Sequence, residues 1–415
     1  MSRKSFLQTI LLLGSLLVSC NSSEQEDAGA PETTGYEKQN MENFIAMKDV
    51  TGKAADVFIK LAESVPSANV KTYSKEGGLD GFVSKKEIKQ IFPVKDNERS
   101  QDACYIVTYK GGGFAILGAD RRIPEILAFS EDSDFPFESE AITLGEKKEA
   151  APSGLRFWLD GMKTAVSLLR TKNINVFADD GSTVGTNNDE PPGSYPDEYP
   201  PFSYLLTTKW GQKNGYNQYI PLCSSGQHAS AGCGPVALAQ IMKYWEFSLV
   251  TFDWANMADT YATTATATLL SDIYDATNSF PSVNDNCATG TSQNQLYYAL
   301  SDYGYSNTNW FHAFDKTIAR SQISSDKPVL LFASLSDNTN AHYWVTDGWF
   351  GQVMIDPDNH PANSQTRYYF HMNWGWYGNY NGWFYTDNST LQTNYTFNAN
   401  SLLMVYNISP AIRLY

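Results

Sequence analysis

The chain has 415 residues, of which 42% are hydrophobic and 14% aromatic, so it exceeds one ordinary domain and carries ample apolar surface for packed cores. This composition excludes disorder along the whole chain. Asp and Glu number 45 against 30 Lys and Arg, which disfavours a nucleic-acid partner because phosphates would be repelled, and a protein or other polymer fits better as a substrate.

The N-terminus has the pattern of an export signal. Cations within residues 1–4 precede the apolar run Phe6–Val18, which is too short to span a bilayer as a mature helix, so residues 1–19 are predicted to be a signal peptide. The run ends in LVSC, which resembles a bacterial lipobox, and we expect Cys20 to carry lipid and to become the mature N-terminus; an ordinary signal peptide with an incidental cysteine is the alternative. Residues 20–46 are polar and acidic, which predicts a flexible tether.

Residues 47–172 are predicted to form a first folded block. Apolar residues recur at helical spacing from Met47 onward, and a further helix is predicted over Ser84–Phe92, where Ser84 and Glu87 have the spacing of a capping box. The β-rich runs CYIVTY and GFAILGA are joined by KGGG, which predicts a hairpin because glycine accepts positive φ. Apolar residues every three or four positions over Ser153–Arg170 predict an amphipathic helix.

A weakly structured segment separates this block from the rest of the chain. Residues 173–201 include FADDGSTVGTNNDEPPGSYPDEYPP, which is rich in Gly, Pro, Asp and Asn and almost free of aliphatic residues. Exposed, pliable backbone is where proteolytic nicking concentrates, so we interpret the segment as an activation linker between a pro-region and an enzyme. A plain interdomain linker is the alternative.

The second block, residues 202–415, contains a cysteine in the context of a catalytic nucleophile. Cys233 is followed by Gly234, Pro235 and the apolar run VALAQIMKYW, and because proline suits the first turn of a helix, the helix is predicted to begin at or beside Cys233. The partial positive charge of a helix N-terminus, together with an adjacent imidazolium, lowers the pKa of a thiol and so favours the reactive thiolate. The alternative is that Cys233 is a small buried hydrophobe.

A histidine suited to act as the base lies far along the chain. The run HYWVTDGWF has β character and places His342 and Trp344 on one face of a strand and Tyr343 on the other, while KPVLLFASL just upstream predicts a neighbouring buried strand. Rigid placement of this kind is what a general base requires. His228 lies close to the nucleophile in sequence and is a rival, whereas His371 is expected to be structural.

Three further residues complete the predicted site. An Asn373 carbonyl that accepts from one imidazole nitrogen would orient the ring, and the Trp374 indole would shield that bond from water; the alternative is an aromatic turn that fills a core. The side-chain amide of Gln212 and the backbone N–H of Cys233 would form an oxyanion hole, for which Gln227 is the competitor.

The remaining cysteines do not indicate a disulfide framework or a metal site. If Cys20 carries lipid and Cys233 is the nucleophile, then Cys104, Cys223 and Cys287 remain, and an odd number argues against a framework, although a bridge between Cys223 and Cys287 stays open. No CxxC pair or Cys/His cluster with zinc spacing is present, and no cofactor is expected.

Four motifs in one order resemble the streptopain family of secreted bacterial cysteine peptidases: WGQKNGYN, GQHASAGCGPVALAQIMKYW, NAHYWVTDGW and HMNWGWYGNYNGWF. The resemblance covers the second block almost end to end, and the first block is similar to that family's propeptide through YIVTYKGGGFAILGADRRIPEILAFS. It implies an α+β, papain-like peptidase with a helical lobe and an antiparallel β-sheet lobe. It also implies that an α+β propeptide domain precedes the peptidase and inhibits it until it is removed.

The residues of the family's motifs map onto this sequence one by one. The resemblance implies the nucleophile Cys233, the base His342, the orienting pair Asn373 and Trp374, and Gln212 in the oxyanion hole, which favours Gln212 over Gln227. Two departures leave the substrate preference open: Gly234-Pro235 follows the nucleophile where the type member has a Val-Ala pair, and the loop from Tyr377 to Tyr380 is bulkier than a glycine-rich version.

The sequence therefore predicts an exported zymogen of a cysteine endopeptidase. Its partners are expected to be protein or peptide substrates, its own propeptide as an intramolecular inhibitor, and a membrane through lipid on Cys20, with no nucleic acid. The expected location is the outer membrane or the cell surface, with release of the mature peptidase. The alternatives are a catalytically silent surface-binding lipoprotein that retains the fold, and another papain-fold chemistry such as an amidase or transglutaminase.

Overall fold

The computed structural model describes residues 35–63, 85–96, 101–136, 151–172, 202–281, 287–334, 341–354, 365–386 and 402–411. The chain divides into two compact units, Met1–Glu42 and Asn43–Tyr415. The described part of the first unit belongs to one helix, α1 (Gly35–Asn43). The predicted signal peptide, the lipidation site Cys20 and the activation linker lie outside the described residues. None of the helices described is long and apolar enough to cross a membrane.

The predicted first block contains helices and four antiparallel strands. Its elements are α2 (Met47–Ala54), α3 (Val57–Glu63), β1 (Ile88–Lys95), β2 (Asp102–Tyr109), β3 (Phe114–Gly118), β4 (Ile126–Ser130) and α5 (Ser153–Lys172). The predicted hairpin is confirmed as β2 and β3, and the glycines of its turn, Gly111, Gly112 and Gly113, all have positive φ. The predicted amphipathic helix is confirmed as α5.

The helix predicted over Ser84–Phe92 is wrong, because this part of the chain forms strand β1. Its residues pair antiparallel with β2, with Ile91 opposite Val107 and Phe92 opposite Ile106. Pro93 explains the outcome in part, since a proline disfavours helical backbone at the preceding residue and is tolerated in an edge strand. The capping-box spacing is a local signal, and pairing with a strand more than ten residues away outweighs it.

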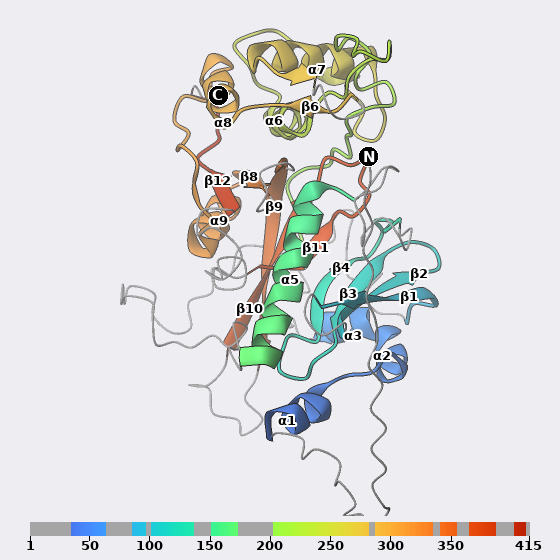
Figure 1. The fold of residues 1–415 in the computed structure, drawn as a ribbon. Coiled ribbons are helices and arrows are strands. Elements are labelled where there is room, and N and C mark those ends of the chain that lie inside the picture. The colour runs from blue at the N-terminus through green and yellow to red at the C-terminus, as the bar shows by residue number, and fades with distance from the viewer. Residues whose placement is uncertain are drawn as a thin grey trace, which may run out of the picture. The chain divides into compact units, whose positions relative to one another are not determined.

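A single ten-stranded sheet runs through both predicted blocks. Its order is β1-β2-β3-β4-β11-β10-β9-β8-β12-β7, so β4 of the first block lies beside β11 (Gly382–Tyr385) of the second block (Figure 1). At this junction Trp383 is opposite Phe129 and Phe384 is opposite Ala128. The backbone hydrogen bonds of the sheet therefore join the predicted propeptide to the predicted peptidase.

The second block contributes helices and the other strands of this sheet. Its remaining elements are α6 (Cys233–Trp245), the 3₁₀ helix η2 (Trp254–Asn256), α7 (Thr264–Ala276), β5 (Phe280–Pro281), β6 (Thr289–Gly290), α8 (Gln293–Asp302), β7 (His312–Ala313), α9 (Lys316–Ile323), β8 (Val329–Ser334), β9 (Ala341–Met354), β10 (Gln365–Asn373) and β12 (Leu402–Val405). The α+β class predicted for the chain is confirmed.

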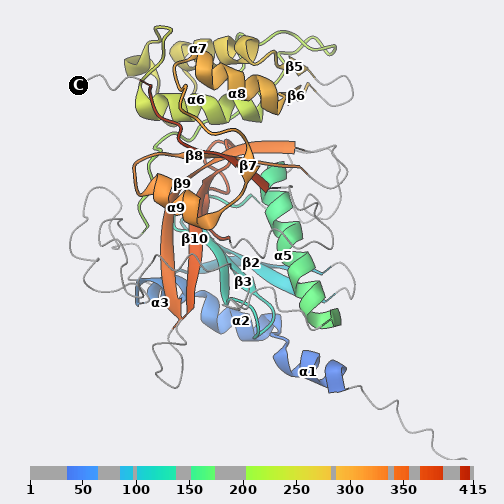
Figure 2. The same cartoon turned by 90° about the vertical axis from the view of Figure 1, so that its left-hand side faces the viewer.

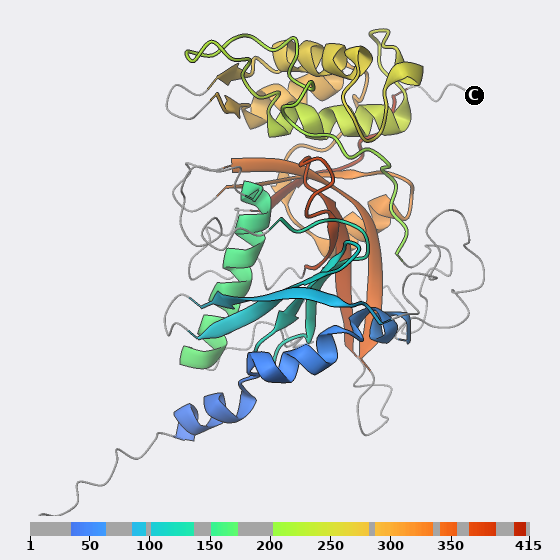
Figure 3. The same ribbon diagram turned by 90° about the vertical axis from the view of Figure 1, so that its right-hand side faces the viewer.

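The two faces of strand β9 belong to different hydrophobic cores. Tyr343 and Val345 pack in one core with α6, α7 and α8, which lie together beyond one end of the sheet in Figure 2. Trp344 packs in the other core, which contains α5 and the first block, and α5 runs along the sheet in Figure 3. The faces predicted for this strand are therefore confirmed, and His342 shares its face with Trp344.

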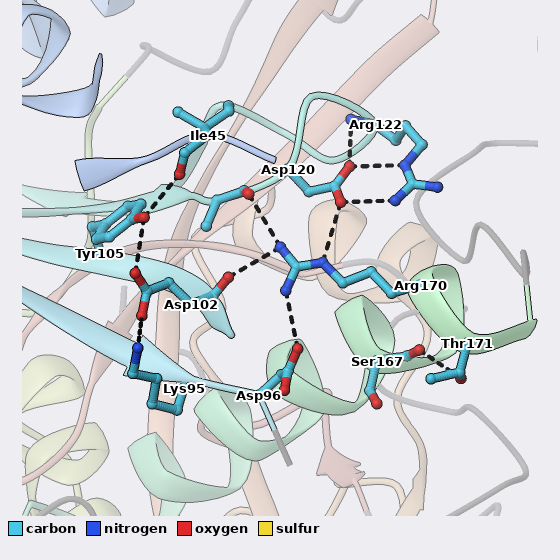
Figure 4. Close-up of polar contacts among 11 residues, drawn as sticks. Ile45, Lys95, Asp96, Asp102, Tyr105, Asp120, Arg122, Ser167, Arg170 and Thr171 are labelled. Atoms are coloured by element: carbon cyan, nitrogen blue, oxygen red, sulfur yellow. Dashed lines mark hydrogen bonds and ion pairs between the residues drawn. The ribbon is translucent and has the colours of Figure 1, made fainter. Parts of the chain in front are cut away.

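A buried arginine joins the last turn of α5 to other parts of the first block (Figure 4). The Arg170 guanidinium is 1% exposed and pairs with Asp96 through Nη1 at 3.0 Å and with Asp120 through Nε at 3.3 Å. Its Nη2 also donates to the carbonyls of Asp102 and Ala119, at 3.0 and 3.1 Å. Because a buried charge is costly unless it is paired and hydrogen-bonded, these contacts hold the C-terminal end of α5 in one position.

Candidate active site

The nucleophile predicted from the sequence lies at the start of a buried helix. Helix α6 begins at Cys233, as predicted, and Pro235 lies in its first turn. Gly232 precedes the helix with φ +91°, and a Cβ on this residue would lie 2.9 Å from Cγ2 of Thr289. The turn therefore requires glycine at this position, both for its backbone conformation and for space.

The Cys233 sulfur is in an environment that favours the neutral thiol. Burial raises the pKa of Cys233, while the backbone N–H groups of Tyr343, Gly234 and Cys233 itself act in the opposite direction. An imidazole is not among the groups that shift this pKa. The thiolate expected from the sequence therefore needs a rearrangement that brings a positive charge to the sulfur.

His342 is held away from the sulfur by aromatic side chains and by α5. It is 3% exposed, and its Nε2 donates to the carbonyl of Trp374 at 3.0 Å. The Trp344 ring is stacked near it and the Trp376 ring meets it edge-on, each with centroids 6.1 Å from the imidazole. A Cβ on Gly154, in the first turn of α5, would lie 3.0 Å from Cδ2 of His342, so the helix backbone lies directly against the ring.

The predicted base and the predicted nucleophile have different neighbours around strand β9. The Tyr343 side chain packs with α6, and the Tyr343 N–H is near the Cys233 sulfur, whereas the preceding residue, His342, points toward α5. Within the part of the chain that is described, no hydrogen bond joins Cys233 to His342. This geometry does not form the thiolate–imidazolium pair, and it corresponds to an inactive arrangement of the two groups.

The pKa of His342 reflects the same environment. Burial lowers it to about 4; the Trp374 carbonyl opposes this effect, and the nearby Arg156 guanidinium adds to it. The ring is therefore neutral at physiological pH in this arrangement.

Asn373 does not contact the imidazole in this structure. Its Nδ2 donates to the carbonyl of Thr208 at 2.7 Å, and its Oδ1 accepts from the N–H of Gly375 at 3.2 Å. Trp374 is fully buried, and it is its backbone carbonyl that holds His342. The predicted orienting role of Asn373 therefore concerns a form in which the imidazole has moved.

Gln212 is beside the turn that leads to the nucleophile, and its competitor is not. The Gln212 carbonyl accepts from the N–H of Ala231 at 2.8 Å, two residues before Cys233. Gln227 is exposed in a turn where its carbonyl accepts from the N–H of Cys223. The rival base, His228, is bonded through Nδ1 to the carbonyl of Ile220. Of the two glutamines, Gln212 is thus the one bonded to Ala231, and the choice of His342 over His228 stays a prediction.

Two features were missed or left open by the sequence reasoning. A disulfide joins Cys223 to Cys287, with Cα atoms 5.5 Å apart, and the Cys287 carbonyl accepts from the N–H of Ser230 near the nucleophile. The presence of several cysteines in a chain with a predicted export signal was the available clue. The contact of Gly154 with His342 was missed altogether, because nothing local in the sequence marks it.

The expectation that His371 is structural agrees with its surroundings. Its Nδ1 is 2.6 Å from Oδ1 of Asp347, and its ring stacks on Tyr204 at 4.0 Å between centroids. The other carboxylate oxygen of Asp347 accepts from the N–H of Leu206 at 2.8 Å. This buried pair therefore fixes the segment that leads toward Gln212.

Comparison with known families agrees with this architecture. Residues 210–249 and 246–384 match the Peptidase C10 family, and residues 54–166 match the family described as Spi protease inhibitor. The fold and the site thus define a papain-like cysteine peptidase preceded by an inhibitor-type propeptide. The Peptidase C10 match covers most of the predicted peptidase block, and the predicted resemblance to the streptopain family is confirmed.

Individual relatives support the same assignment. The chain is 23% identical to streptopain from Streptococcus pyogenes over 366 residues, which cover 74% of this chain and 79% of streptopain. It is 24% identical over 331 residues to the thiol protease/hemagglutinin PrtT from Porphyromonas gingivalis; the match covers 72% of this chain but only 35% of that longer protein. The fold is shared with a prointerpain A fragment from Prevotella intermedia, with a TM-score of 0.53 and 20% identity, over 77% of this chain and 98% of the fragment.

The lowered pKa of His342 predicts that acid weakens its contact with α5. Above pH 6.5 the imidazole is neutral whether buried or released; between pH 6.5 and about 4 only the released ring takes up a proton, so release is increasingly favoured, by up to about 3 kcal/mol below pH 4. Histidine NMR of the full-length Cys233→Ala protein, assigned with His342→Gln, should show the His342 ring neutral down to about pH 4. Titration near its ordinary value of 6.5 would contradict the buried geometry.

Proposed function

We propose that the chain is the zymogen of a cysteine endopeptidase that hydrolyses protein substrates with Cys233 as nucleophile and His342 as base. The observation that carries the proposal is the position of Cys233 at the N-terminus of α6, inside a C10 peptidase domain, with Gln212 bonded to the same turn. The chain is similar to streptopain and to PrtT. PrtT is named as a thiol protease, which supports this class of reaction.

In the proposed mechanism, removal of the propeptide lets the imidazole turn toward the sulfur. His342 takes the proton of Cys233, and the thiolate attacks the carbonyl carbon of the scissile peptide. The side-chain amide of Gln212 and the N–H of Cys233 stabilise the oxyanion of the tetrahedral intermediate. His342 then protonates the leaving amine and activates the water that releases the acyl group from sulfur. Asn373 would accept from the second ring nitrogen and hold the ring, with Trp374 shielding the bond.

The contacts of residues 126–136 support an inhibitory role for the first block. Strand β4 pairs with β11, and Asp132 forms an ion pair at 3.0 Å with Lys209, three residues before Gln212. The N–H of Tyr380 donates to the carbonyl of Asp134 at 2.8 Å, and its hydroxyl donates to the carbonyl of Pro136 at 2.8 Å. These contacts hold the loop after Trp374 and the segment before Gln212. Both segments adjoin the proposed catalytic groups.

Helix α5 supports the same role from the other side of β9. Gly154 lies against His342 and Trp374, while Arg170 holds the far end of the helix in the first block. As long as both ends are held, the first turn of α5 stays packed against the imidazole beside the Trp374 carbonyl. We infer that inhibition acts by keeping the base away from the nucleophile.

The proposal also covers maturation and location, which concern residues outside the described ranges. We infer that residues 47–172 are the inhibitory propeptide, that cleavage within residues 173–201 gives a mature N-terminus between Lys172 and Pro201, and that residues 202–415 form the active peptidase. The LVSC sequence supports lipid on Cys20 and display on the cell surface or outer membrane. Mass spectrometry of the N-terminal peptides of the precursor and of the active species tests both inferences.

Casein cleavage tests the enzymatic proposal. The processed protein should degrade casein, and Cys233→Ala should lower the rate by at least about a thousandfold, because removal of the nucleophile leaves only binding and oxyanion stabilisation. Ser301→Ala is the matched control: it also removes a single side-chain heteroatom, from an exposed position on α8, and should leave the rate of the processed enzyme unchanged. Equal cleavage by wild type and Cys233→Ala, or no cleavage by either after the linker is cut, would instead favour a silent binding protein or a different papain-fold chemistry.

Gly154→Ala tests the inhibitory contact. The added Cβ would lie 2.9 Å from Cζ3 of Trp374 and 3.0 Å from His342, so the first turn of α5 must shift at a cost of about 1–3 kcal/mol. The unprocessed variant should react with iodoacetamide at Cys233 roughly tenfold faster than the unprocessed wild type. Gly52→Ala is the control, since a Cβ there meets nothing within 4 Å. Equal alkylation of all three proteins would show that α5 does not restrain the site.

A further inference from the structure

We propose that Tyr377 is a positioning residue for catalysis, which holds the backbone on both sides of Gln212 and thereby sets the geometry of the oxyanion hole. This inference rests on the proposed peptidase function. Tyr377 lies in the loop after Trp374, and the sequence motifs did not predict a part for it in the chemistry.

Three contacts join Tyr377 to the segment that carries Gln212. The Tyr377 N–H donates to the carbonyl of Trp210 at 3.0 Å, and its hydroxyl accepts from the N–H of Lys213 at 2.7 Å. Between these two bonds the ring covers Gly211, where a Cβ would lie only 2.1 Å from Cε1 of Tyr377. The backbone and side chain of Tyr377 together span the four residues 210–213, and Gly211 is required because the ring fills the space of its missing side chain.

The same segment is also attached to the helix of the nucleophile. Oε1 of Gln240, a fully buried residue of α6, accepts from the N–H of Trp210 at 3.3 Å. The Gln212 carbonyl accepts from the N–H of Ala231. Gln240 and Ala231 thus fix the position of this segment relative to Cys233. Tyr377 binds the same segment through its own hydrogen bonds.

The backbone of Tyr377 suggests that its contacts are maintained at a cost. Its φ is +61°, a left-handed conformation that is unfavourable for a residue with a bulky side chain, and Gly375 and Gly378 on either side also have positive φ. This turn connects Trp374, whose carbonyl holds His342, to the oxyanion segment. Tyr377 is therefore the residue through which the loop of the base and the predicted oxyanion donor are joined.

The chemical consequence concerns the transition state more than substrate binding. An oxyanion donor works only when its N–H is about 2.7–3.1 Å from the position where negative charge develops, so a small displacement of Gln212 weakens stabilisation of the tetrahedral intermediate. Formation of the thiolate–imidazolium pair does not depend on this donor. Loss of Tyr377 contacts should therefore lower kcat while KM and the reactivity of the thiol stay close to normal.

Tyr377→Phe in the processed enzyme tests the inference, since it keeps the ring over Gly211 and removes only the hydroxyl acceptor. With a peptide amide substrate, kcat should fall about tenfold and KM should change less than about twofold, while the rate of Cys233 alkylation by iodoacetamide stays at the wild-type value. Tyr216→Phe is the matched control: this neighbouring ring lies 6.0 Å from the Tyr377 ring, its hydroxyl has no partner among the described residues, and its loss should leave kcat unchanged.

A double substitution separates positioning from general damage. In a Gln212→Ala background, Tyr377→Phe should cause no further loss of kcat, because the donor that it positions is already gone. The inference is overturned if Tyr377→Phe keeps the wild-type kcat, if its loss is additive with that of Gln212→Ala, or if alkylation and thermal stability fall in parallel with kcat. Failure of the underlying function would look different, since the wild-type processed enzyme would then show no turnover that depends on Cys233.

Discussion

The placement of one imidazole governs the rest of this structure. His342 is a neutral, buried ring on the face of β9 that packs against α5, and it donates to the Trp374 carbonyl. Everything packed around it, including Trp344, Trp376 and the first turn of α5, excludes water and so disfavours its charged form. A thiolate–imidazolium pair requires that charged form, so the packing that stabilises this arrangement also opposes catalysis.

In the mechanism that we propose, the first block inhibits through the interactions that fold it together with the peptidase. Backbone pairing of β4 with β11 makes it part of the peptidase sheet, and the buried Arg170 pairs lock α5 at the end away from the site. The same helix therefore has one end fixed in the propeptide and the other against the base. Cutting the chain after α5 would leave these contacts in place but make them intermolecular, so that the first block can then dissociate from the peptidase.

The local parts of the fold could be predicted from the sequence, and the contacts between distant parts could not. The start of α6 at Cys233 follows from Gly-Cys-Gly-Pro, and the face of His342 follows from strand alternation. Strand β1 was mistaken for a helix because its stability comes from pairing with β2, which a local capping pattern does not report. The role proposed for Tyr377 depends on a hydrogen bond to Lys213, a residue 164 positions away, and no spacing rule reveals such a contact.

The sequence predicts which residues form the site, but it does not report how they are arranged. Residue types at Cys233, His342 and Gln212 predict acyl transfer, and the structure shows the His342 ring bonded to the Trp374 carbonyl. A structure of the processed peptidase, with Cys233 alkylated to mark the reactive site, tests this account most directly. We expect the His342 ring to be turned toward Cys233, with a ring nitrogen about 3–4 Å from the sulfur. We expect Asn373 to accept from the other ring nitrogen. An imidazole still bonded to the Trp374 carbonyl in an enzyme that is fully active would contradict it.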